Sequence, residues 1–348
     1  MIATKGYAVH SSDDQLAHWD FDRREVGPKD VLIEIIFSGV CHSDIHQVRG
    51  EWGNSTYPMV PGHEIVGRIV KVGVEVTKFQ VGALAGIGCM VDSCRECNNC
   101  KSGHEQFCQK GQTVYTYNSV EKDGKTPTYG GYSNKIVCDE AFVVSVSDKL
   151  PLEGVAPLLC AGITTYSPLK RWKIGPGHKV AVLGLGGLGH MAVKFAASFG
   201  AEVTMLSTSP SKEGDAKRLG AHKFCNTKDE AQVKDYTSYF DFIIDTVSAP
   251  HNYDMYLNML HTFGTMICVG IPPEPIHLNG FALLGQNRTL TGSNIGGIEE
   301  TQEMLDYCAE HNIVSDVEVI NINYINEAYE RVLKSDVKYR FVINVATI

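Results

Sequence analysis

The stretch Gly-Leu-Gly-Gly-Leu-Gly at residues 184–189 constrains the fold of this 348-residue chain more than any other segment. Its pattern G-x-G-x-x-G is weak by itself, because glycine is abundant throughout the chain. The context makes it informative: residues 179–183 predict a buried strand, residues 187–199 have helical spacing, and residues 202–206 predict a second strand. We therefore predict a βαβ unit within a doubly wound parallel sheet.

The same glycine-rich turn predicts a dinucleotide-binding site. Gly184 allows the tight turn, Gly186 lets the backbone approach a pyrophosphate, and Gly189 lets the helix pack on the strand. The exposed amides at the start of the helix, which include those of Gly187 and Leu188, would receive the anion. The alternative is a tight strand-to-helix turn without a ligand, and the flanking strands and helix favour the binding site.

The end of the second strand indicates which dinucleotide is bound. An NAD site places Asp or Glu about 20 residues after the glycines, where a carboxylate binds the ribose diol. This chain instead has Ser207, Thr208 and Ser209, followed by Lys212 and Arg218. Hydroxyls and a cation suit a 2′-phosphate, so we predict NADP(H). Alternatively, Ser209 serves only as the N-cap of the following helix.

The remaining sequence predicts two kinds of architecture. Residues 1–150 contain many short strands with glycine turns, which favour a β-rich barrel or sandwich. From residue 151 strands and helices alternate, and later segments continue both types. The further strands are expected at residues 31–37, 64–73, 240–247, 264–270 and 339–345, and the further helices at 212–219, 299–311 and 325–334.

Charge and composition exclude several functions. A formal net charge of −9 with no basic stripe argues against nucleic-acid binding. The most apolar run, residues 180–199, is interrupted by glycines, a His and a Lys, so no membrane span is expected. The first residues lack the apolar core of a signal peptide, and a cytoplasmic location is expected.

Four of the eleven cysteines are crowded into one irregular polar segment at short loop spacing. They are Cys94, Cys97, Cys100 and Cys108. Four thiolates close a tetrahedral zinc site without an open position, so this set predicts a structural zinc that orders the segment. Free thiols and a redox C-x-x-C are the alternatives. The leftover cysteines 89, 138, 225, 268 and 308 are expected in the core.

A second, open zinc site is predicted from residues far apart in the sequence. Cys41, His63 and Cys160 supply two thiolates and an imidazole, and the fourth position would remain for water or substrate. Glu64 is an occasional fourth ligand, a carboxylate behind the ligands, or a salt-bridge partner. Single buried Cys or His residues usually only pack, so the hypothesis depends on the fold bringing all three together.

Two neighbours of the first ligand suggest proton transfer. Ser43 and His46 follow Cys41 in the same loop, where a hydroxyl and an imidazole can pass a proton outward.

These motifs together resemble the zinc-dependent medium-chain alcohol dehydrogenases, and within them the cinnamyl-alcohol-dehydrogenase-like branch. The resemblance covers nearly the whole chain. It is carried by Gly-Val-Cys-His-Ser-Asp-Ile-His at 39–46, Pro-Gly-His-Glu at 61–64, the four-cysteine segment, Cys-Ala-Gly-Ile-Thr-Thr-Tyr-Ser-Pro at 160–168, Gly-Leu-Gly-Gly-Leu-Gly-His at 184–190 and Tyr-Arg-Phe-Val at 339–342.

The resemblance implies an α/β protein with a GroES-like β-rich catalytic domain and a Rossmann doubly wound parallel sheet. It implies a catalytic domain at 1–155 and 295–348, an NADP-binding domain at 156–294, and a homodimer paired through the Rossmann sheets. It also implies that Thr164, His42 and Arg340 approach the cofactor, besides the zinc ligands, the relay and the 2′-phosphate residues named above.

Two positions depart from the branch. Tyr115 stands where the branch often has Trp beside the substrate, and Ser211 occupies a position where relatives often carry Lys. Side chains expected around the substrate are Trp52, Tyr57, Tyr115, Leu284 and Ile295.

The expected activity is reversible NADP(H)-linked hydride transfer between primary alcohols and aldehydes, with aromatic or allylic (cinnamyl-type) substrates. One alternative is an NAD-linked zinc polyol dehydrogenase, which the four-cysteine segment and the missing acidic residue disfavour. The other is a non-catalytic NADPH- or zinc-binding protein, which the complete set of open-site ligands disfavours.

Overall fold

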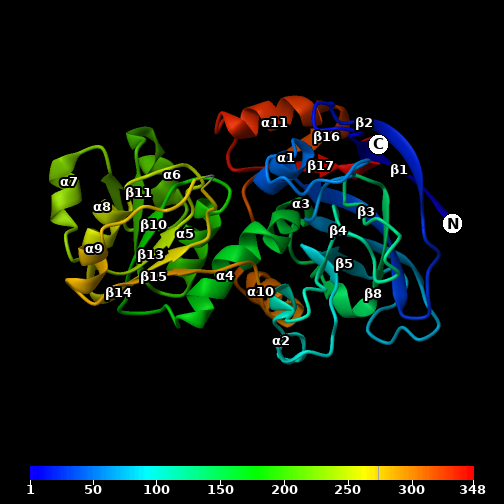
Figure 1. The fold of residues 1–348 in the computed structure, drawn as a ribbon, viewed down its shortest axis with the longest axis horizontal. Coiled ribbons are helices and arrows are strands. Elements are labelled where there is room, and N and C mark those ends of the chain that lie inside the picture. Colours follow the sequence, from blue (N-terminus) through cyan, green and yellow to red (C-terminus); the bar gives the residue numbers. More distant parts are fainter. Residues whose placement is uncertain (273) are drawn as a thin grey trace. The chain divides into compact units, whose positions relative to one another are not determined.

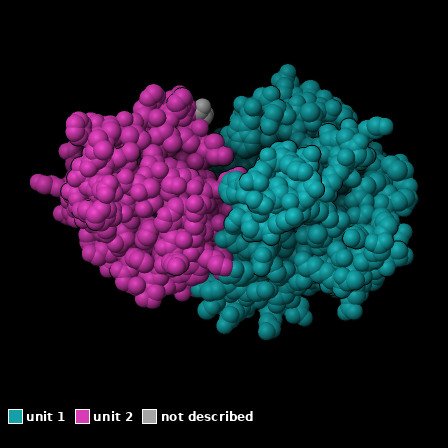
Figure 2. All heavy atoms as spheres, turned by 60° about the horizontal axis from the view of Figure 1, so that its bottom comes forward, with its two compact units in different colours: residues 1–163, 296–348 teal, residues 164–295 magenta. Residues whose placement is uncertain are grey.

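The computed structural model describes residues 1–272 and 274–348, and its chain divides into two compact units (Figures 1 and 2). Unit 1 comprises Met1–Ile163 and Gly296–Ile348, and unit 2 comprises Thr164–Ile295. Unit 2 is therefore inserted into the sequence of unit 1. No helix among the described residues is both long enough and apolar enough to span a bilayer.

Unit 2 contains a six-stranded sheet in the order β12-β11-β10-β13-β14-β15, and every neighbouring pair is parallel. The predicted doubly wound sheet is thus confirmed. Its strands are β10 (Lys179–Leu183), β11 (Glu202–Ser207), β12 (Lys223–Asn226), β13 (Phe240–Asp245), β14 (Leu260–Cys268) and β15 (Thr289–Gly292).

Helices connect the strands of unit 2 and bury them. The residues of β10 and β11 are almost all buried, as expected for parallel strands covered on both faces. The connecting helices are α5 (Gly189–Ser198), α6 (Glu213–Arg218), α7 (Glu230–Asp235), α8 (Tyr253–Met259) and α9 (Gly280–Leu284). The helix α4 (Ala161–Arg171) precedes β10; its first residues belong to unit 1 and the rest to unit 2. The helix expected at 212–219 is split, since a 3-10 turn, η4 (Pro210–Lys212), precedes α6.

Unit 1 is built on a seven-stranded sheet, consistent with the predicted β-rich domain. The sheet order is β16-β17-β3-β4-β5-β9, and β8 also pairs with β3. Its strands are β3 (Asp30–Gly39), β4 (Ile65–Val72), β5 (Leu84–Ile87), β8 (Lys135–Asp139), β9 (Val144–Ser145), β16 (Val317–Asn321) and β17 (Arg340–Asn344). Two smaller sheets pair β1 (Ile2–Ala8) with β2 (Ala17–Arg23) and β6 (Met90–Asp92) with β7 (Val114–Tyr115).

The helical elements of unit 1 flank these sheets (Figure 1). They are α1 (His42–Val48), α2 (Asn98–Lys101), α3 (Leu152–Val155), α10 (Ile298–His311), α11 (Ile325–Leu333), and the 3-10 turns η1 (Glu105–Phe107), η2 (Glu140–Phe142), η3 (Ala156–Leu159), η5 (Ile322–Tyr324) and η6 (Val345–Thr347).

The turn η3 determines where the first boundary between the units falls. It packs against β3, β4, β5 and β17, so residues 156–163 belong with unit 1. The boundary expected after residue 155 assigned them to the Rossmann domain, because the alternation of strands and helices begins there in the sequence. Tertiary contact with the sheet of unit 1 explains the difference.

Candidate active site

Strand pairing brings the four side chains of the expected open zinc site together in unit 1. β3 and β4 pair antiparallel with Ser38 opposite Ile65, which places the end of β3 beside the residues that precede β4. Cys41 follows β3 as the N-cap of α1, whereas His63 and Glu64 precede β4. Cys160 comes from the junction of η3 and α4. Ligand atoms of these four side chains all lie within 4.8 Å of one another.

The donor set fits zinc. All four residues are buried, and the two sulfur atoms are 3.9 Å apart. The hydrogen bond from the Cys160 thiol, assisted by His63, holds the pKa of Cys41 well below its usual range. Burial raises the pKa of Glu64 to about 8, although Arg340 opposes this. Its Oε2 atom is buried and has no hydrogen-bond partner among the described residues. Two thiols, an imidazole and an unpaired carboxylate oxygen suit a tetrahedral zinc ion.

Asp44 orients these ligands, a role that was not predicted from the sequence. Its Oδ1 atom lies 3.1 Å from Nδ1 of His63, and its Oδ2 atom accepts the backbone amide of Cys41 at 2.9 Å. It also accepts the Tyr132 hydroxyl at 3.3 Å, and its side chain is fully buried. A buried carboxylate held by several donors keeps the imidazole in one tautomer and one orientation. The sequence feature that could have indicated this role is the position of Asp44 between the two predicted relay residues, Ser43 and His46.

Arg340 reaches the same cluster from the last strand. β17 pairs with β3, and the Arg340 guanidinium binds the Glu64 carboxylate and donates to the Val40 carbonyl at 2.8 Å. In this structure the guanidinium therefore binds Glu64 and the Val40 carbonyl. Its expected contact with the cofactor stays a prediction.

The proposed relay residues lie on one helix, α1. Ser43 and His46 are three residues apart, so they share a face of the helix. His46 stacks between His42 and Trp52, with ring centroids 5.0 and 5.2 Å away, and pairs with the Glu51 carboxylate. No hydrogen bond joins Ser43 to His46 within the described part of the chain, so the relay stays a prediction.

Cys89 and Tyr117 also border the cluster. The expectation that Cys89 is a core residue is wrong, because its thiol is only partly buried and donates a hydrogen bond to the Leu159 carbonyl at 3.8 Å. The Tyr117 ring stacks on His63 at 5.8 Å. Cys138, Cys225 and Cys308 are buried as expected, and Cys268 is half-buried.

The four-cysteine segment forms a second ligand set in unit 1. The sulfur atoms of Cys94, Cys97, Cys100 and Cys108 lie within 4.8 Å of one another. Backbone amides point at these sulfurs, with Cys97 donating to Cys94 at 3.3 Å and Gln109 donating to Cys97 at 3.4 Å. Although desolvation opposes it, backbone hydrogen bonds lower the pKa of Cys108 to about 6. Four sulfurs gathered in this way, two of them donated to by backbone amides, are suited to a closed structural zinc site.

The glycine-rich turn of unit 2 has the backbone geometry of a phosphate cradle. Gly184 directly follows β10 and has a φ of 88°, a left-handed conformation that favours glycine. A Cβ atom at Gly189 would collide with the Gly184 carbonyl, so glycine is required for the close packing of turn and helix. Gly186 is exposed, and a Cβ there would meet no atom within 4 Å, which leaves room for a ligand. Gly187 and Leu188 follow it, half-exposed.

The residues expected at a 2′-phosphate gather near this turn. The Ser207 hydroxyl, at the end of β11, accepts the Ser209 amide at 3.2 Å. Ser209 makes no side-chain capping bond, contrary to the alternative that its hydroxyl is used by the helix. Lys212 donates to the Leu185 carbonyl at 2.9 Å, so its ammonium lies over the glycine-rich turn. Thr208 is exposed, whereas Thr164 is buried in α4.

The residues expected around the substrate occupy different environments. Trp52, Tyr115 and Leu284 are exposed, Leu284 to 75% at the end of α9. The Tyr57 hydroxyl donates to the Val48 carbonyl at 2.9 Å, and Ile295 adopts a φ of 39°. Their contact with substrate stays a prediction.

Comparison with known proteins agrees with this architecture. The alcohol dehydrogenase GroES-like domain matches residues 27–148, and the zinc-binding dehydrogenase domain matches residues 187–310. The chain is 54% identical over its full length to NADP-dependent alcohol dehydrogenase C 1 of Mycolicibacterium smegmatis, of which it covers 99%.

Two solved structures are similar along nearly the whole chain. A cinnamyl alcohol dehydrogenase of Sorghum bicolor is 45% identical with a TM-score of 0.96, covering 99% of this chain and 98% of that one. A Helicobacter pylori enzyme of the same kind, solved with NADP(H), is 45% identical with a TM-score of 0.93, covering 99% of each chain. The chain belongs to the zinc-dependent medium-chain alcohol dehydrogenases, in their cinnamyl-alcohol-dehydrogenase-like branch.

Proposed function

We propose that this enzyme interconverts primary alcohols and aldehydes with NADP(H), and that aromatic or allylic aldehydes of the cinnamyl type are good substrates. The observation that carries the proposal is the buried cluster of Cys41, His63, Glu64 and Cys160. Two thiols and an imidazole supply three ligands, and zinc sites of this composition keep one position for water or substrate.

Different side chains of unit 1 bind the zinc, orient its ligands and transfer the proton. Cys41, His63 and Cys160 hold the zinc, which when bound acts as a Lewis acid on the substrate oxygen. Asp44 fixes the orientation of His63, and Arg340 binds Glu64 within the same buried cluster. Ser43 exchanges a proton with the substrate oxygen, and His46, which is partly exposed, exchanges it with solvent.

In this proposal unit 2 supplies the dinucleotide site, and unit 1 (residues 1–163 and 296–348) is the catalytic domain. Gly184, Gly186 and Gly189 form the turn that receives the pyrophosphate, with the amides of Gly187 and Leu188.

The preference for NADP(H) rests on the end of β11. Ser207, Thr208, Ser209 and Lys212 offer hydroxyls and a cation where a carboxylate would repel a 2′-phosphate. Ser211 lacks the second cation that relatives often carry. The Mycolicibacterium relative is named as NADP-dependent, and the Helicobacter structure contains NADP(H), which supports the same preference.

The test is the initial rate of cinnamaldehyde reduction with NADPH and with NADH, compared for wild type and Cys160→Ala. We expect a large preference for NADPH and no turnover by Cys160→Ala, while the matched buried-cysteine variant Cys138→Ala stays active. Substantial activity of Cys160→Ala without bound zinc would contradict the assigned site. Faster turnover with NADH would contradict the cofactor assignment, and NAD-linked mannitol oxidation would favour a polyol dehydrogenase.

The proposed assembly is a homodimer paired through unit 2. β15 is the edge strand of its sheet, and Phe281 and Leu284 on the neighbouring α9 expose 78% and 75% of their surface. An unpaired edge with exposed apolar side chains is suited to pairing with a second copy. Light scattering on the purified protein measures the mass, and a monomer at micromolar concentration would contradict this assembly.

A cytoplasmic location belongs to the same proposal. None of the eleven cysteines, all of which lie in the described part of the chain, forms a disulfide, as is usual in a reducing compartment. Fractionation of cells that express the chain tests this location.

A further inference from the structure

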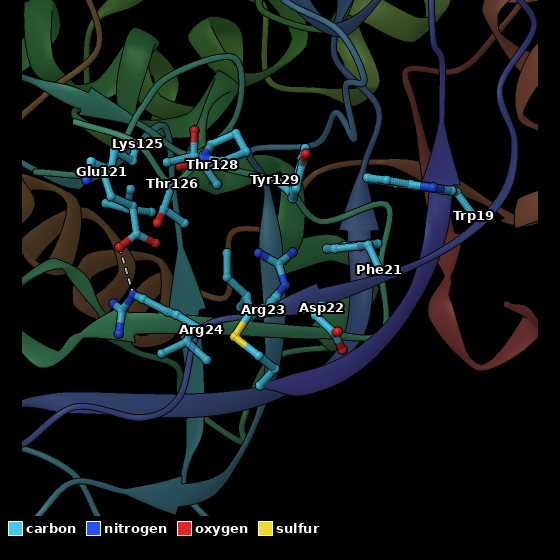
Figure 3. Close-up of a pocket in the computed structure, with 16 residues that line it drawn as sticks. Trp19, Phe21, Asp22, Arg23, Arg24, Glu121, Lys125, Thr126, Thr128 and Tyr129 are labelled. Atoms are coloured by element: carbon cyan, nitrogen blue, oxygen red, sulfur yellow. Dashed lines mark ion pairs between the residues drawn. The ribbon is translucent and has the colours of Figure 1, made fainter. Parts of the chain in front are cut away.

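Unit 1 contains a pocket of about 510 Å³ that includes none of the residues of either zinc cluster. One wall comes from β2 and the other from the segment at 121–129, as Figure 3 shows. Its volume lies within the range that small-molecule sites usually occupy. The function proposed above makes no use of this pocket.

The pocket contains a cation that lacks a counter-ion. Arg23 lines it and is half-buried, and its Nη2 atom donates to the Gly130 carbonyl at 3.0 Å and to the Ser133 hydroxyl at 2.9 Å. Both partners are neutral. Among the described residues no carboxylate lies within ion-pair distance of Arg23, and its buried Nε atom has no hydrogen-bond partner. A guanidinium removed from water without a counter-ion is unfavourable.

The unfavourable burial of this charge is seen in the pKa of Arg23. Desolvation lowers the pKa of Arg23 to about 9, although Glu121 works in the opposite direction. An anion that entered the pocket would supply the missing opposite charge.

The other charged groups of the pocket are already compensated or exposed. Arg24 pairs with Asp30 through Nη2 and Oδ1 at 3.0 Å and with Glu121 at 2.8 Å, the ion pair drawn in Figure 3. The Glu121 carboxylate is therefore committed to Arg24 rather than to Arg23. Lys125 is exposed and adds a second positive charge. Asp22 also lines the pocket and is exposed to solvent. Among these groups, the partly buried charge without an ion-pair partner among the described residues is that of Arg23.

Aromatic side chains stand beside this cation. Trp19 and Phe21 stack with ring centroids 4.9 Å apart, and Tyr129 meets both rings edge-on at 5.4 and 5.0 Å. The Arg23 guanidinium lies 5.2 Å from the Phe21 ring centroid and points toward the Thr128–Tyr129 side of the pocket in Figure 3. Flat apolar surfaces of this kind bind planar rings by stacking or edge contact.

We propose that this pocket is a second ligand site, which binds a small organic anion with a planar apolar ring attached to a carboxylate. The carboxylate accepts hydrogen bonds from the Arg23 guanidinium, and the ring packs against Trp19 and Tyr129. The combination of one uncompensated guanidinium and an aromatic wall selects this class over neutral rings, which leave the charge unpaired, and over inorganic anions, which leave the wall uncovered.

The experiment uses benzoate as probe and Trp19 as reporter. The chain has three tryptophans, so the double variant Trp52→Phe/Trp172→Phe leaves Trp19 as the single indole. Benzoate, the uncharged isostere benzamide and sodium chloride are titrated into this variant while its emission is recorded. Calorimetry on the wild-type enzyme, saturated with NADPH, gives the dissociation constant independently.

We expect saturable benzoate binding that changes Trp19 emission, with benzamide at least tenfold weaker. Arg23→Gln should weaken benzoate roughly ten- to hundredfold, because it removes a charged hydrogen-bond donor. The control Arg68→Gln, which removes an exposed arginine elsewhere in unit 1, should leave binding unchanged.

Three results would overturn the proposal. The first is benzoate binding that leaves Trp19 emission unaltered. The second is equal affinity of the wild-type enzyme for benzamide and benzoate, a result that does not depend on the folding of any Arg23 variant. The third is an unchanged benzoate affinity in Arg23→Gln whose circular dichroism matches wild type, since benzoate would then bind elsewhere, for example at the zinc site.

Discussion

The carboxylate of Asp44 lies 3.1 Å from Nδ1 of His63, so the other ring nitrogen of His63 remains for the cluster that contains Cys41 and Cys160. The same carboxylate accepts the backbone amide of Cys41. One buried side chain thus positions two of the four groups that can hold the catalytic zinc.

This relationship predicts the effect of Asp44→Asn. The substitution replaces one carboxylate oxygen by an NH₂ group, which cannot accept a hydrogen bond, so either the Cys41 amide or the His63 ring loses its acceptor. We expect zinc affinity or kcat to fall roughly 10- to 100-fold. Zinc content by mass spectrometry and steady-state rates measure this, with the exposed Asp13→Asn as control. Wild-type zinc affinity and rate in Asp44→Asn would show that the contact is dispensable.

The four-cysteine segment predicts a separation of the two zinc ions. Cys97→Ser removes a buried sulfur from the closed set, so bound zinc should fall from about two to about one per chain. The segment then loses its organising ion, and the midpoint of thermal unfolding should decrease. Cys225→Ser, in the other unit, is the control for losing a buried thiol. Two zinc ions retained by Cys97→Ser would contradict a structural site here.

His46→Gln tests the proton relay. The glutamine keeps a polar side chain on the same face of α1 but cannot carry a proton, and water can replace it in part. We expect kcat to decrease about tenfold with zinc content unchanged. A loss as complete as that of Cys160→Ala, or no loss at all, would remove His46 from the relay.

Lys212→Ala tests the cofactor preference. The ammonium of Lys212 lies over the glycine-rich turn, where a 2′-phosphate would use its charge. We expect KM for NADPH to rise roughly tenfold while KM for NADH changes little. Lys217→Ala removes an exposed lysine that pairs with Glu213 on α6 and serves as the control. An equal rise in KM for both cofactors would mean that Lys212 stabilises the glycine-rich turn and does not recognise the 2′-phosphate.

A pH dependence of stability is expected from His251 in unit 2. Burial opposes protonation of this ring, but Asp245 at 3.2 Å and the Ala249 carbonyl raise its pKa above the usual 6.5. A raised pKa in the folded state stabilises the protein fully below about pH 6.5, and this contribution is lost as pH rises through the folded pKa.

The free energy of unfolding of His251→Asn should therefore lie below that of wild type mainly at acidic pH, and the difference should shrink toward pH 9. Urea unfolding at several pH values measures it. The exposed His277→Asn is the control, which should show no such trend. A difference that is constant with pH would mean that His251 stabilises the unit by packing alone.

Local sequence determined the parts of this protein that depend on neighbours along the chain. The glycines of 184–189 sit between a strand and a helix whose periodicity is visible in the sequence, so the parallel sheet could be predicted from spacing alone. The four cysteines at 94–108 lie within one short segment, and their spacing along it suffices to bring their sulfurs together.

Tertiary structure decided what depends on pairing between distant segments. Cys41, His63 and Cys160 meet because β3 pairs with β4 and η3 packs on the same sheet, which no local pattern specifies. The pairing of β17 with β3 delivers Arg340 to Glu64 from near the other end of the sequence. Cys89 was predicted to be an ordinary core residue, yet it borders the cluster that contains Cys160. The fold, and not the segment around a residue, sets the environment of its side chain.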